Sequence, residues 1–374
     1  MIIGIDVSSI PYGTGVSSYT LNLIRHLLRL DKTNTYKLFF SSLRQPLSKE
    51  IQDLSANGNV KIYHFRIPPS LLEFVWNRLH ILPIELLIGK CDVFHTWDWY
   101  QPPSHQAQIV TTVHDLIPFL YPQWQHPKTI ATFKRKFHQA TLHPTHFICV
   151  SQNTQSDLLR LFPKISKKST TVIYEAAEDK YYPQTKDKID KAKRIYGLNS
   201  FVLAQGTREP RKNLDRLIKA FINFKKHNPR SHVELAISGK YGWGNDITHP
   251  KFPYIKVLGY IPEKDMVSLH ASALALAYPS LYEGFGLPVL KSMAVGTPVI
   301  TSASSSLSEV TGKAALLVNP KSIKEIEQAI SQLVNEPNLR QKLKQAGLAQ
   351  VKKYSWDQTA HQTLSLYQSL TKKT

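Results

Sequence analysis

The sequence predicts an α/β protein made of two domains with similar architecture. Along its 374 residues, short apolar runs with β-branched side chains alternate with segments of helical periodicity, which is the pattern of parallel sheets covered by helices. A chain of this length exceeds what one hydrophobic core usually supports. We therefore expect one domain over residues 1–180 and another over 195–355, with the last helix, 356–374, packing back on the first domain. The cleft between two such domains is the expected ligand site.

The first domain begins with a predicted buried strand, residues 2–6, and a loop that leads into a helix. The apolar face of this helix carries Tyr19, Leu23, Leu27 and Leu30. In the loop, Gly13 and Gly15 resemble the start of a dinucleotide-binding fingerprint, but Ser18 stands in place of its third glycine. We expect further strands at residues 37–40, 60–63, 93–95, 109–113, 147–150 and 171–174.

Polar residues directly follow two of these strands. His114 and Asp115 come after the strand at 109–113, and Ser151 follows the strand at 147–150. Because the carboxyl ends of parallel strands share one edge of a sheet, these residues should face one crevice. His114 is then either a structural histidine or a ligand-binding one.

A second α/β series begins after a segment rich in lysine and aspartate. Residues 180–193 show little apolar periodicity, and we place the linker near them. We expect strands at 201–204, 233–237, 255–258, 271–278 and 298–302, and we expect 308–310 and 315–318 to finish the sheet. Helices are expected at 323–334 and from about residue 354 onward.

The loop after the strand at 201–204 gathers three cations, Arg208, Arg211 and Lys212. Asn213 can cap the helix that follows, whose apolar face is Leu214, Leu217, Ile218 and Phe221. Cations just before a helix N-terminus suit a diphosphate, because charges and backbone N–H groups act on the same oxygens. A solvent-exposed charged loop is the alternative.

The stretch 278–302 joins a strand to a short helix through the sequence Glu-Gly-Phe-Gly. Pro288 suits the first helical turn, and Gly296 suits the position just past the helix. The helix N-terminus should bind an anion. Glu283 would repel a phosphate alone, so the ligand should also offer hydroxyl groups, as a sugar phosphate does. A tight turn with a surface glutamate is the alternative.

The composition is that of a basic, globular protein. Lys and Arg number 47 against 27 Asp and Glu, which gives a net charge of +20 and favours an acidic partner. Nucleic acid, an anionic membrane surface and phosphorylated small molecules compete for this role. Because no basic arm or zinc-finger pattern accompanies the charge, we do not expect nucleic-acid binding. The sequence also shows no carboxylate cluster for a metal.

No run of about 18 apolar residues is present, so no membrane-spanning helix is expected. The apolar run at residues 1–5 is too short for a signal peptide, and the acidic residue Asp6 follows it directly. A cytoplasmic protein is therefore expected. The most apolar stretch, residues 71–88, either lies on a membrane surface or packs on the sheet of its own domain. Cys91 and Cys149 lie in or beside apolar runs, so we expect buried free thiols in a reducing compartment.

Six motifs in one order carry a resemblance to a known family. They are H-D-L-I-P, G-T-R-E-P-R-K-N, G-Y-I-P, S-L-Y-E-G-F-G-L-P, G-T-P-V-I-T-S and A-A-L-L-V-N-P. Together they resemble the retaining glycosyltransferases of the "group 1" family, family four, which have the GT-B fold and use nucleotide sugars. The resemblance implies two Rossmann-like domains facing a central cleft, the first binding the acceptor and the second the nucleotide diphosphate sugar.

The resemblance also implies site residues. Arg211 and Lys212 would neutralise the diphosphate leaving group, Glu283 would contact sugar hydroxyls, and His114 would hold the sugar at the reacting centre. The donor-binding site would be completed by Gly13, Gly15, Gly206, Thr207, Arg208, Gly239, Tyr260, Ile261, Gly284, Phe285, Gly286, Leu287 and Lys291. Thr207 stands where many relatives have an arginine. Neither a metal nor another cofactor is implied.

One position departs from the family pattern. Relatives carry a second glutamate eight positions after the first, usually a ligand of the nucleotide ribose, and this chain has Lys291 there. A lysine cannot accept a hydrogen bond from a hydroxyl group. A nucleotide-sugar-binding homologue with reduced or no transferase activity is therefore the alternative function, and an NAD-dependent oxidoreductase, suggested by Gly13 and Gly15, is the third.

The leading prediction is a hexosyltransferase for cell-surface polysaccharide. Overall similarity of the motifs favours transfer of mannose from GDP-mannose with retention of configuration. The acceptor is expected to be a glycan or a polyprenyl- or other lipid-linked saccharide. The basic surface suits peripheral binding to the inner face of the cell membrane.

Overall fold

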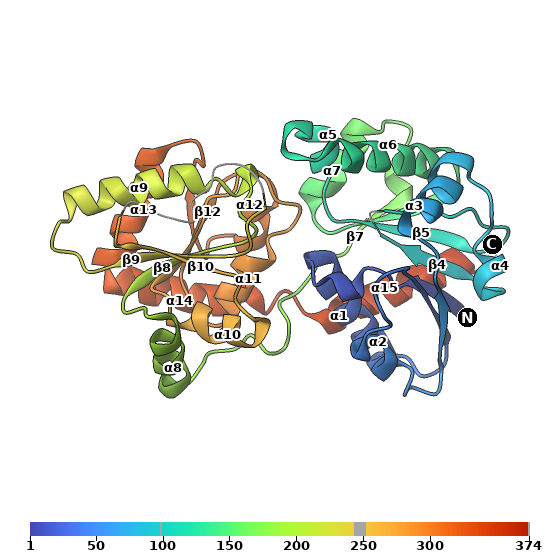
Figure 1. Ribbon diagram of the computed structural model, residues 1–374, viewed down its shortest axis with the longest axis horizontal. Helices are drawn as coiled ribbons and strands as arrows, with labels where there is room; N and C mark the ends of the chain where they lie inside the picture. The colour runs from blue at the N-terminus through green and yellow to red at the C-terminus, as the bar shows by residue number, and fades with distance from the viewer. Residues whose placement is uncertain (98, 243–251, 373–374) are drawn as a thin grey trace. The chain divides into compact units, whose positions relative to one another are not determined.

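The computed structural model describes residues 1–97, 99–242 and 252–372 (Figure 1). The chain divides into two compact units, Met1–Glu175 with Trp356–Thr374, and Ala176–Ser355. Each unit is a parallel sheet with helices on both faces. The predicted α/β class is therefore confirmed, and the last helix belongs to the first unit, as expected.

The sheet of the first unit has the strand order β3-β2-β1-β4-β5-β6-β7 among the described residues. All neighbours pair in parallel, so that Ile5 lies opposite Leu38 on one side and His95 on the other. The chain turns back across the sheet between β1 and β4, which is where doubly wound sheets bind ligands. The strands are β1 (Ile2–Asp6), β2 (Thr35–Ser41), β3 (Val60–Phe65), β4 (Val93–Thr96), β5 (Gln108–Val113), β6 (Thr145–Cys149) and β7 (Thr170–Val172).

Two groups of helices cover this sheet (Figure 1). On one face lie α5 (Ile117–Leu120), α6 (Pro127–Leu142) and α7 (Gln152–Leu161), and on the other lie α1 (Gly15–Leu30), α2 (Lys49–Leu54) and α15 (Trp356–Thr371). Helix α15 packs along α1, where Trp356 meets the edge of Tyr19 at 5.6 Å between ring centroids. Short helical turns lie at η1 (Ile10–Tyr12), η3 (Pro122–Trp124) and η4 (Lys167–Ser169).

Helix α1 forms where the periodicity predicts it. Thr14 caps it, with the side chains of Thr14 and Ser17 each accepting a hydrogen bond from the other's backbone N–H. Tyr19, Leu23 and Leu27 are fully buried, whereas Leu30 in the last turn is 46% exposed. The predicted apolar face of the helix is therefore buried as far as Leu27.

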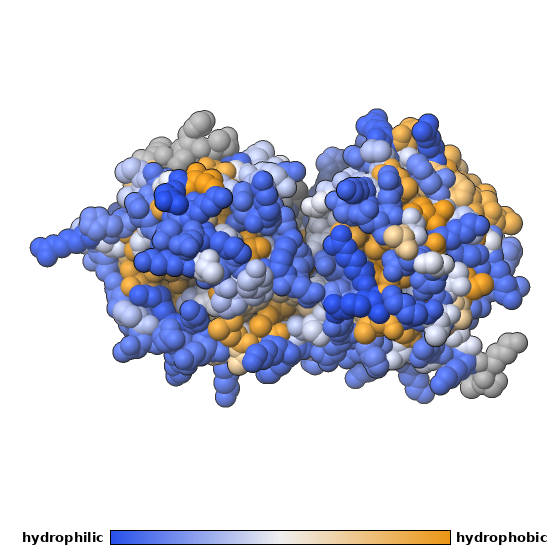
Figure 2. Space-filling view, turned by 90° about the horizontal axis from the view of Figure 1, so that it is seen from below, coloured by the Kyte–Doolittle hydropathy of each residue, from blue (hydrophilic) through white to orange (hydrophobic). Residues whose placement is uncertain are grey.

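The apolar stretch 71–88 forms α3 (Pro69–Leu72), the π-helical turn η2 (Glu73–Leu79) and α4 (Glu85–Ile88). One side packs into the core through Leu72, Trp76, Ile84 and Ile88. The other side exposes Leu71, Phe74, Leu79, Ile81 and Leu86. Hydrophobic patches stand among hydrophilic ones on the face of the first unit in Figure 2, on the right. Within the described ranges, no helix is both long and apolar enough to cross a membrane.

The second unit repeats this design with the strand order β10-β9-β8-β11-β12-β13. Its reversal point lies between β8 and β11. The strands are β8 (Phe201–Gln205), β9 (Glu234–Ser238), β10 (Ile255–Gly259), β11 (Ala275–Tyr278), β12 (Val299–Ser302) and β13 (Leu316–Val318). The helices are α8 (Lys186–Tyr196), η5 (Pro210–Lys212), α9 (Leu214–His227), α10 (Glu263–Ser272), α11 (Leu287–Ala294), α12 (Ser306–Thr311), α13 (Ile323–Asn335) and α14 (Pro337–Val351).

Several boundaries differ from the predictions. The segment expected to be a linker, 180–193, contains most of α8, which packs on α10, and the second unit begins at Ala176. The apolar stripe of α8 is only Ile189, Ala192 and Tyr196, too narrow to stand out among lysines. Residues 271–272 end α10 rather than begin a strand, residues 308–310 lie in α12 rather than in the sheet, and α14 was not expected.

Both cysteines are buried free thiols, as predicted. Burial raises the pKa of each thiol to about 12, with smaller effects of nearby charges on Cys91. Neither thiol is therefore poised as a nucleophile.

Candidate active site

Two loops of the second unit meet at the reversal point of its sheet. One follows β8 and the other follows β11, and these strands are hydrogen-bonded neighbours. The backbone N–H of Leu281 donates to the carbonyl of Arg211 at 2.8 Å, which ties the loops together. The predicted diphosphate loop and the predicted sugar-phosphate loop thus form one site.

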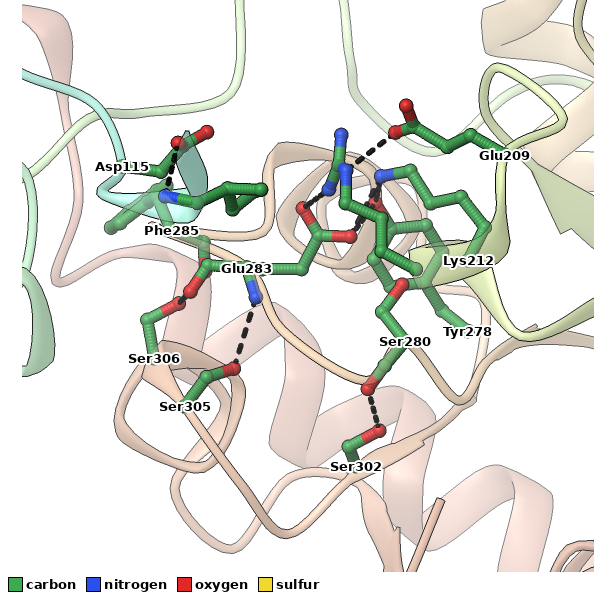
Figure 3. A network of polar contacts seen from close by, with 12 residues as sticks. Asp115, Glu209, Lys212, Tyr278, Ser280, Glu283, Phe285, Ser302, Ser305 and Ser306 are labelled. Carbon is green, nitrogen blue, oxygen red and sulfur yellow. Dashed lines mark hydrogen bonds and ion pairs between the residues drawn. The ribbon is translucent and has the colours of Figure 1, made fainter. Parts of the chain in front are cut away.

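The centre of this site is the buried carboxylate of Glu283 (Figure 3). Its Oε2 accepts from Nη1 of Arg211 at 2.6 Å, and its Oε1 accepts from Nζ of Lys212 at 2.7 Å and from the hydroxyl of Tyr278 at 2.8 Å. Arg211 also pairs with Glu209 through Nε. The three motif residues Arg211, Lys212 and Glu283 are thus brought into direct contact.

Burial and neighbouring charges act in opposite directions on the pKa values of Glu283 and Lys212. Burial alone would raise the pKa of the Glu283 carboxyl, but Arg211 and Lys212 together lower it to about 2. Burial and the charge of Arg211 lower the pKa of the Lys212 ammonium, against the attraction of Glu283. Glu283 is therefore ionised at neutral pH, with Arg211 and Lys212 in direct contact with it.

Close backbone packing at the sheet edge requires glycine at Gly239. Its φ is +134°, and a Cβ atom there would lie 1.9 Å from the carbonyl oxygen of Gly206. The N–H of Gly206 donates to Ser238, and the N–H of Gly239 donates to Gly259. The carboxyl ends of β8, β9 and β10 are therefore drawn together, as at sites where backbone N–H groups approach a ligand.

The loop after β11 is held by the start of α12. The hydroxyl of Ser306 donates to the carbonyls of Glu283 and Phe285, and the N–H of Glu283 donates to the hydroxyl of Ser305. Gly286, at φ +111°, is the N-cap of α11, and Pro288 occupies the first turn of that helix as predicted. A Cβ at Gly286 would lie 2.7 Å from Leu307. Glu283 is thus presented by a rigid loop.

Asn213 differs from its predicted role as a capping side chain. It occupies the N-cap position of α9 but has φ +60°, and its side chain makes no cap hydrogen bond. Its Nδ2 donates instead to the carbonyls of Pro279 and Pro320, at 2.9 and 2.6 Å. Asn213 therefore joins the two loops of the site.

The other residues implied as donor-binding have varied surroundings. Arg208 is buried with its guanidinium over the ring of Tyr241, at 5.4 Å from the centroid. Tyr260 is 62% exposed, whereas Ile261 packs in the core and offers only its backbone. The ring of Phe285 packs against Tyr354. Gly206, Thr207, Gly284 and Leu287 lie in the two loops or at the start of α11.

Lys291, the position that departs from the family pattern, is held by two carboxylates. Its Nζ lies 3.1 Å from Glu178 and 3.0 Å from Glu263, and 4.7 Å above the ring of Tyr181. The hydroxyl of Tyr181 donates to the same oxygen of Glu263 at 2.7 Å. Lys291 is thus held between two carboxylates of its own unit.

The remaining predicted residues belong to the first unit. His114 follows β5, and its Nδ1 lies 3.0 Å from Oε1 of Glu175. The edge of Tyr19 packs on the imidazole at 4.7 Å between centroids. Glu175 thus orients the ring with its Nδ1 as the donor. Gly13, at φ +63°, and Gly15 lie at the start of α1.

Sequence reasoning did not find several partners in these clusters. They are Tyr278, Glu209, Glu175, Glu178, Tyr181 and Glu263. Glu209 lies within a motif and Tyr278 lies close to one, so both could have been flagged by position, but Glu175 lies 61 residues from His114 in the sequence. Across the described parts of the chain, no group of three His, Cys, Asp or Glu residues could hold a metal ion.

Comparison with known proteins assigns both halves of the chain. Residues 185–350 match the family described as "Glycosyl transferases group 1", and residues 13–179 match "Glycosyltransferase Family 4". The chain is 30% identical over 372 residues to O-antigen chain mannosyltransferase B of Escherichia coli, covering 96% of each protein. It is 27% identical to O-antigen chain mannosyltransferase RfbU of Salmonella typhimurium, covering 72% of each.

Solved structures share the fold. A sucrose-phosphate synthase from Thermosynechococcus elongatus superposes with a TM-score of 0.75 at 19% identity, over 99% of both chains. WaaG, a glycosyltransferase involved in lipopolysaccharide biosynthesis, gives 0.72 at 12% identity, over 98% of this chain and 99% of its own. The strand order of the two sheets and the two paired loops are those of the GT-B fold. Because it matches relatives over nearly its full length, the chain belongs to the group 1 glycosyltransferases.

Proposed function

We propose that this protein transfers mannose from GDP-mannose to a glycan or lipid-linked saccharide, with retention of configuration. Its class is that of a nucleotide-sugar-dependent hexosyltransferase of cell-surface polysaccharide biosynthesis. The choice of mannose rests on two relatives named as O-antigen chain mannosyltransferases. The alternative, a homologue that binds nucleotide sugars without transfer, rests on Lys291.

The observation that carries the proposal is the cluster of Arg211, Lys212 and Glu283 at the sheet reversal. When a nucleoside diphosphate leaves the anomeric carbon, negative charge grows on the diphosphate and positive charge on the sugar. Fixed cations stabilise the leaving group without reorganising, which is the most effective form of electrostatic catalysis. In this mechanism Arg211 and Lys212 bind the diphosphate, and Glu283 orients them and accepts from sugar hydroxyls. No metal is required for these steps.

Transfer and binding assays test the proposal. We expect GDP-mannose to raise the melting temperature and to support transfer to mannose-containing acceptors, with UDP-, ADP- and dTDP-sugars and NAD as comparisons. Activity that survives excess chelator would support the metal-free mechanism. If none of these nucleotide sugars binds, the proposed function is wrong, and binding without any turnover would favour the alternative.

We also propose that the enzyme works at an anionic membrane surface. Support comes from the exposed side chains of Leu71, Phe74 and Leu86, beside the exposed cations Arg78 and Lys90. Apolar groups that enter the interface and cations that meet lipid headgroups act together. Sedimentation with vesicles should show binding to anionic but not neutral lipid. The double variant Phe74→Ser with Leu86→Ser should lose it, whereas Leu142→Ser, at another exposed leucine, should not.

A further inference from the structure

The second unit contains a pocket on the face formed by α8 and α10, which pack on each other (Figure 1). This α8–α10 pocket has a volume of about 340 Å³ and is also lined by Lys180, Tyr182 and Gln184, from the segment that leads into α8. Its volume lies at the lower end of the range of roughly 300–1,000 Å³ found for small-molecule sites. Among the residues that the structure describes, none of those lining the pocket belongs to the two loops around Glu283. A ligand of the pocket would therefore bind outside the candidate active site.

Cations dominate the walls of the α8–α10 pocket. The lysines that line it are Lys180, Lys188, Lys191 and Lys264, and the carboxylate that lines it is Asp265. Oδ2 of Asp265 already accepts a hydrogen bond from the hydroxyl of Tyr196 at 2.9 Å. The walls thus carry an excess of positive charge, which attracts an anion.

Helix α8 separates its charges so that cations line the pocket. Lys188, Lys191 and Ile195 follow one another at spacings of three and four residues, which places them on one face of the helix. The acidic residues of this helix, Asp187 and Asp190, do not line the pocket. Lysines three residues apart repel each other and destabilise a helix. An anion bound between them would remove this repulsion.

Most of the lining lysines are available to a ligand. Lys180 is engaged by Glu178. Within the described ranges of the chain, no carboxylate pairs with the other three lysines, and all three are exposed. The ammonium group of Lys188 instead lies over the ring of Tyr182, at 5.7 Å from its centroid. These lysines can therefore contact an anion without breaking an ion pair.

The chemistry of the walls favours a phosphate group. All the lining cations are lysines, which bind phosphate as point charges, whereas arginine suits the planar, bidentate geometry of a carboxylate. A phosphate monoester carries up to two negative charges and can be shared among several lysines. Tyr182 and Ile195 also line the pocket and are 51% and 57% exposed, so they can cover the organic part of a phosphorylated molecule.

We propose that the α8–α10 pocket binds the phosphate groups of a small phosphorylated ligand through Lys188, Lys191 and Lys264. A soluble phosphorylated metabolite and the headgroup of an anionic lipid both carry this chemistry. Because the lysines are exposed, binding should weaken as the ionic strength rises. The site does not depend on the proposed transferase function, since its cations lie outside the loops that form the candidate active site.

Calorimetric titration with inorganic pyrophosphate tests this inference. Excess GDP is included to occupy the candidate active site. The double variant Lys188→Ala with Lys191→Ala should bind pyrophosphate about tenfold more weakly than the wild type, as for the loss of two exposed ion pairs. Alanine favours a helix, so α8 should persist. The matched control, Lys167→Ala with Lys168→Ala, removes the same charge from an exposed position of the first unit and should bind as the wild type does.

Vesicles separate the two sources of phosphate. The variant Phe74→Ser with Leu86→Ser removes the membrane contact proposed for the first unit. If this variant still binds phosphatidylglycerol vesicles, and the binding falls when Lys188→Ala and Lys191→Ala are added, the ligand is a lipid headgroup. If pyrophosphate binds but these vesicles do not, the ligand is a soluble phosphorylated molecule.

Comparison of the two double variants decides the inference. It is wrong if the Lys188 and Lys167 pairs lose pyrophosphate and vesicle binding equally, because net charge alone would then explain the binding. It is also wrong if the Lys188 pair loses neither. If the wild type does not bind GDP, the proposed donor is wrong, whereas a loss of pyrophosphate binding confined to the Lys188 pair would still support the pocket.

Discussion

The two sheets of this enzyme place a buried carboxylate at the same topological position but surround it differently. Asp6 is the last residue of β1, which pairs with β4, and Glu283 lies in the loop after β11, which pairs with β8. Burial raises the pKa of Asp6 to about 6. Burial acts in the same direction on Glu283, but Arg211 and Lys212 bring its pKa down to about 2. Neighbouring side chains, rather than the fold, therefore decide which ligand chemistry each site suits.

This contrast bears on the donor site proposed in the second unit. Two cations fixed on a carboxylate suit a ligand that becomes more negative as it departs, which is the diphosphate. Variants that remove these features should therefore affect the two units separately.

Removing a cation from the Glu283 cluster should have the largest effect. We expect Lys212→Ala to lower kcat by about 100- to 1,000-fold, as for loss of one fixed donor to a developing negative charge. Arg211 remains to neutralise Glu283, so the fold should persist. Steady-state kinetics with a thermal melt on the same sample measures both.

Lys219→Ala, at an exposed lysine on α9, is the matched control and should behave as the wild type. A Lys212→Ala enzyme with a normal kcat and a raised donor KM would place the lysine in ground-state binding instead.

His114 tests the contribution of the first unit to the reaction. We expect His114→Ala to lower kcat roughly 10- to 100-fold, the range for a lost hydrogen bond to a charged group. Glu175→Gln should lower it less, because an amide oxygen can still accept from Nδ1. If Glu175→Gln were as damaging as His114→Ala, the charge of Glu175 and not its orienting role would matter.

Much of this fold can be predicted from local patterns. Apart from residues 308–310, each predicted strand lies within or overlaps an observed strand, because buried parallel strands are continuous apolar runs bounded by turn residues. Helix α14 was not predicted from the sequence. Only Leu343 and Gly347 on it are buried, so it has no clear apolar stripe. Helix α8 was not predicted because its sequence is rich in lysine and its apolar stripe is narrow.

The site could be predicted only where motifs mark it. Motifs mark Arg211, Lys212 and Glu283. Their ion pairing, however, depends on two separate loops, and Arg211 and Glu283 are 72 residues apart in the sequence. The carboxylates that hold Lys291 come from a linking segment and from the start of α10, where no pattern points to them. The position of Asp6 at the end of β1, beside β4, depends on strand order, which hydrophobic periodicity does not specify.

The raised pKa of Asp6 predicts a pH-dependent stability. Its folded pKa exceeds its unfolded value, so the folded state binds the proton more tightly and wild-type stability falls as pH rises from about 4 to 6. Asp6→Asn removes this loss and should be more stable than the wild type above pH 6, by about 1–3 kcal/mol. Urea denaturation at several pH values measures the difference, which should nearly vanish at pH 4. A constant difference would show that Asp6 titrates normally.

Substitution of Lys291 should have the smallest effect among these variants, and it should show whether this lysine supports or weakens nucleotide binding. Restoring the glutamate of relatives by Lys291→Glu would bring three carboxylates together with Glu178 and Glu263. Like charges at this distance repel, so we expect nucleotide affinity to fall up to about tenfold rather than improve. Calorimetric titration with GDP measures this change, and Lys291→Met should lie between the two.

The charge-swapped double variant, Lys291→Glu with Glu263→Lys, separates position from charge. It restores an ion pair across the same gap, so it should recover affinity if the lysine serves to hold a carboxylate in place. If the single Lys291→Glu variant instead binds GDP more tightly and transfers faster, then the natural lysine weakens the donor site. The enzyme would in that case be a transferase of reduced activity, because its donor site would lack the glutamate that the family pattern has at this position.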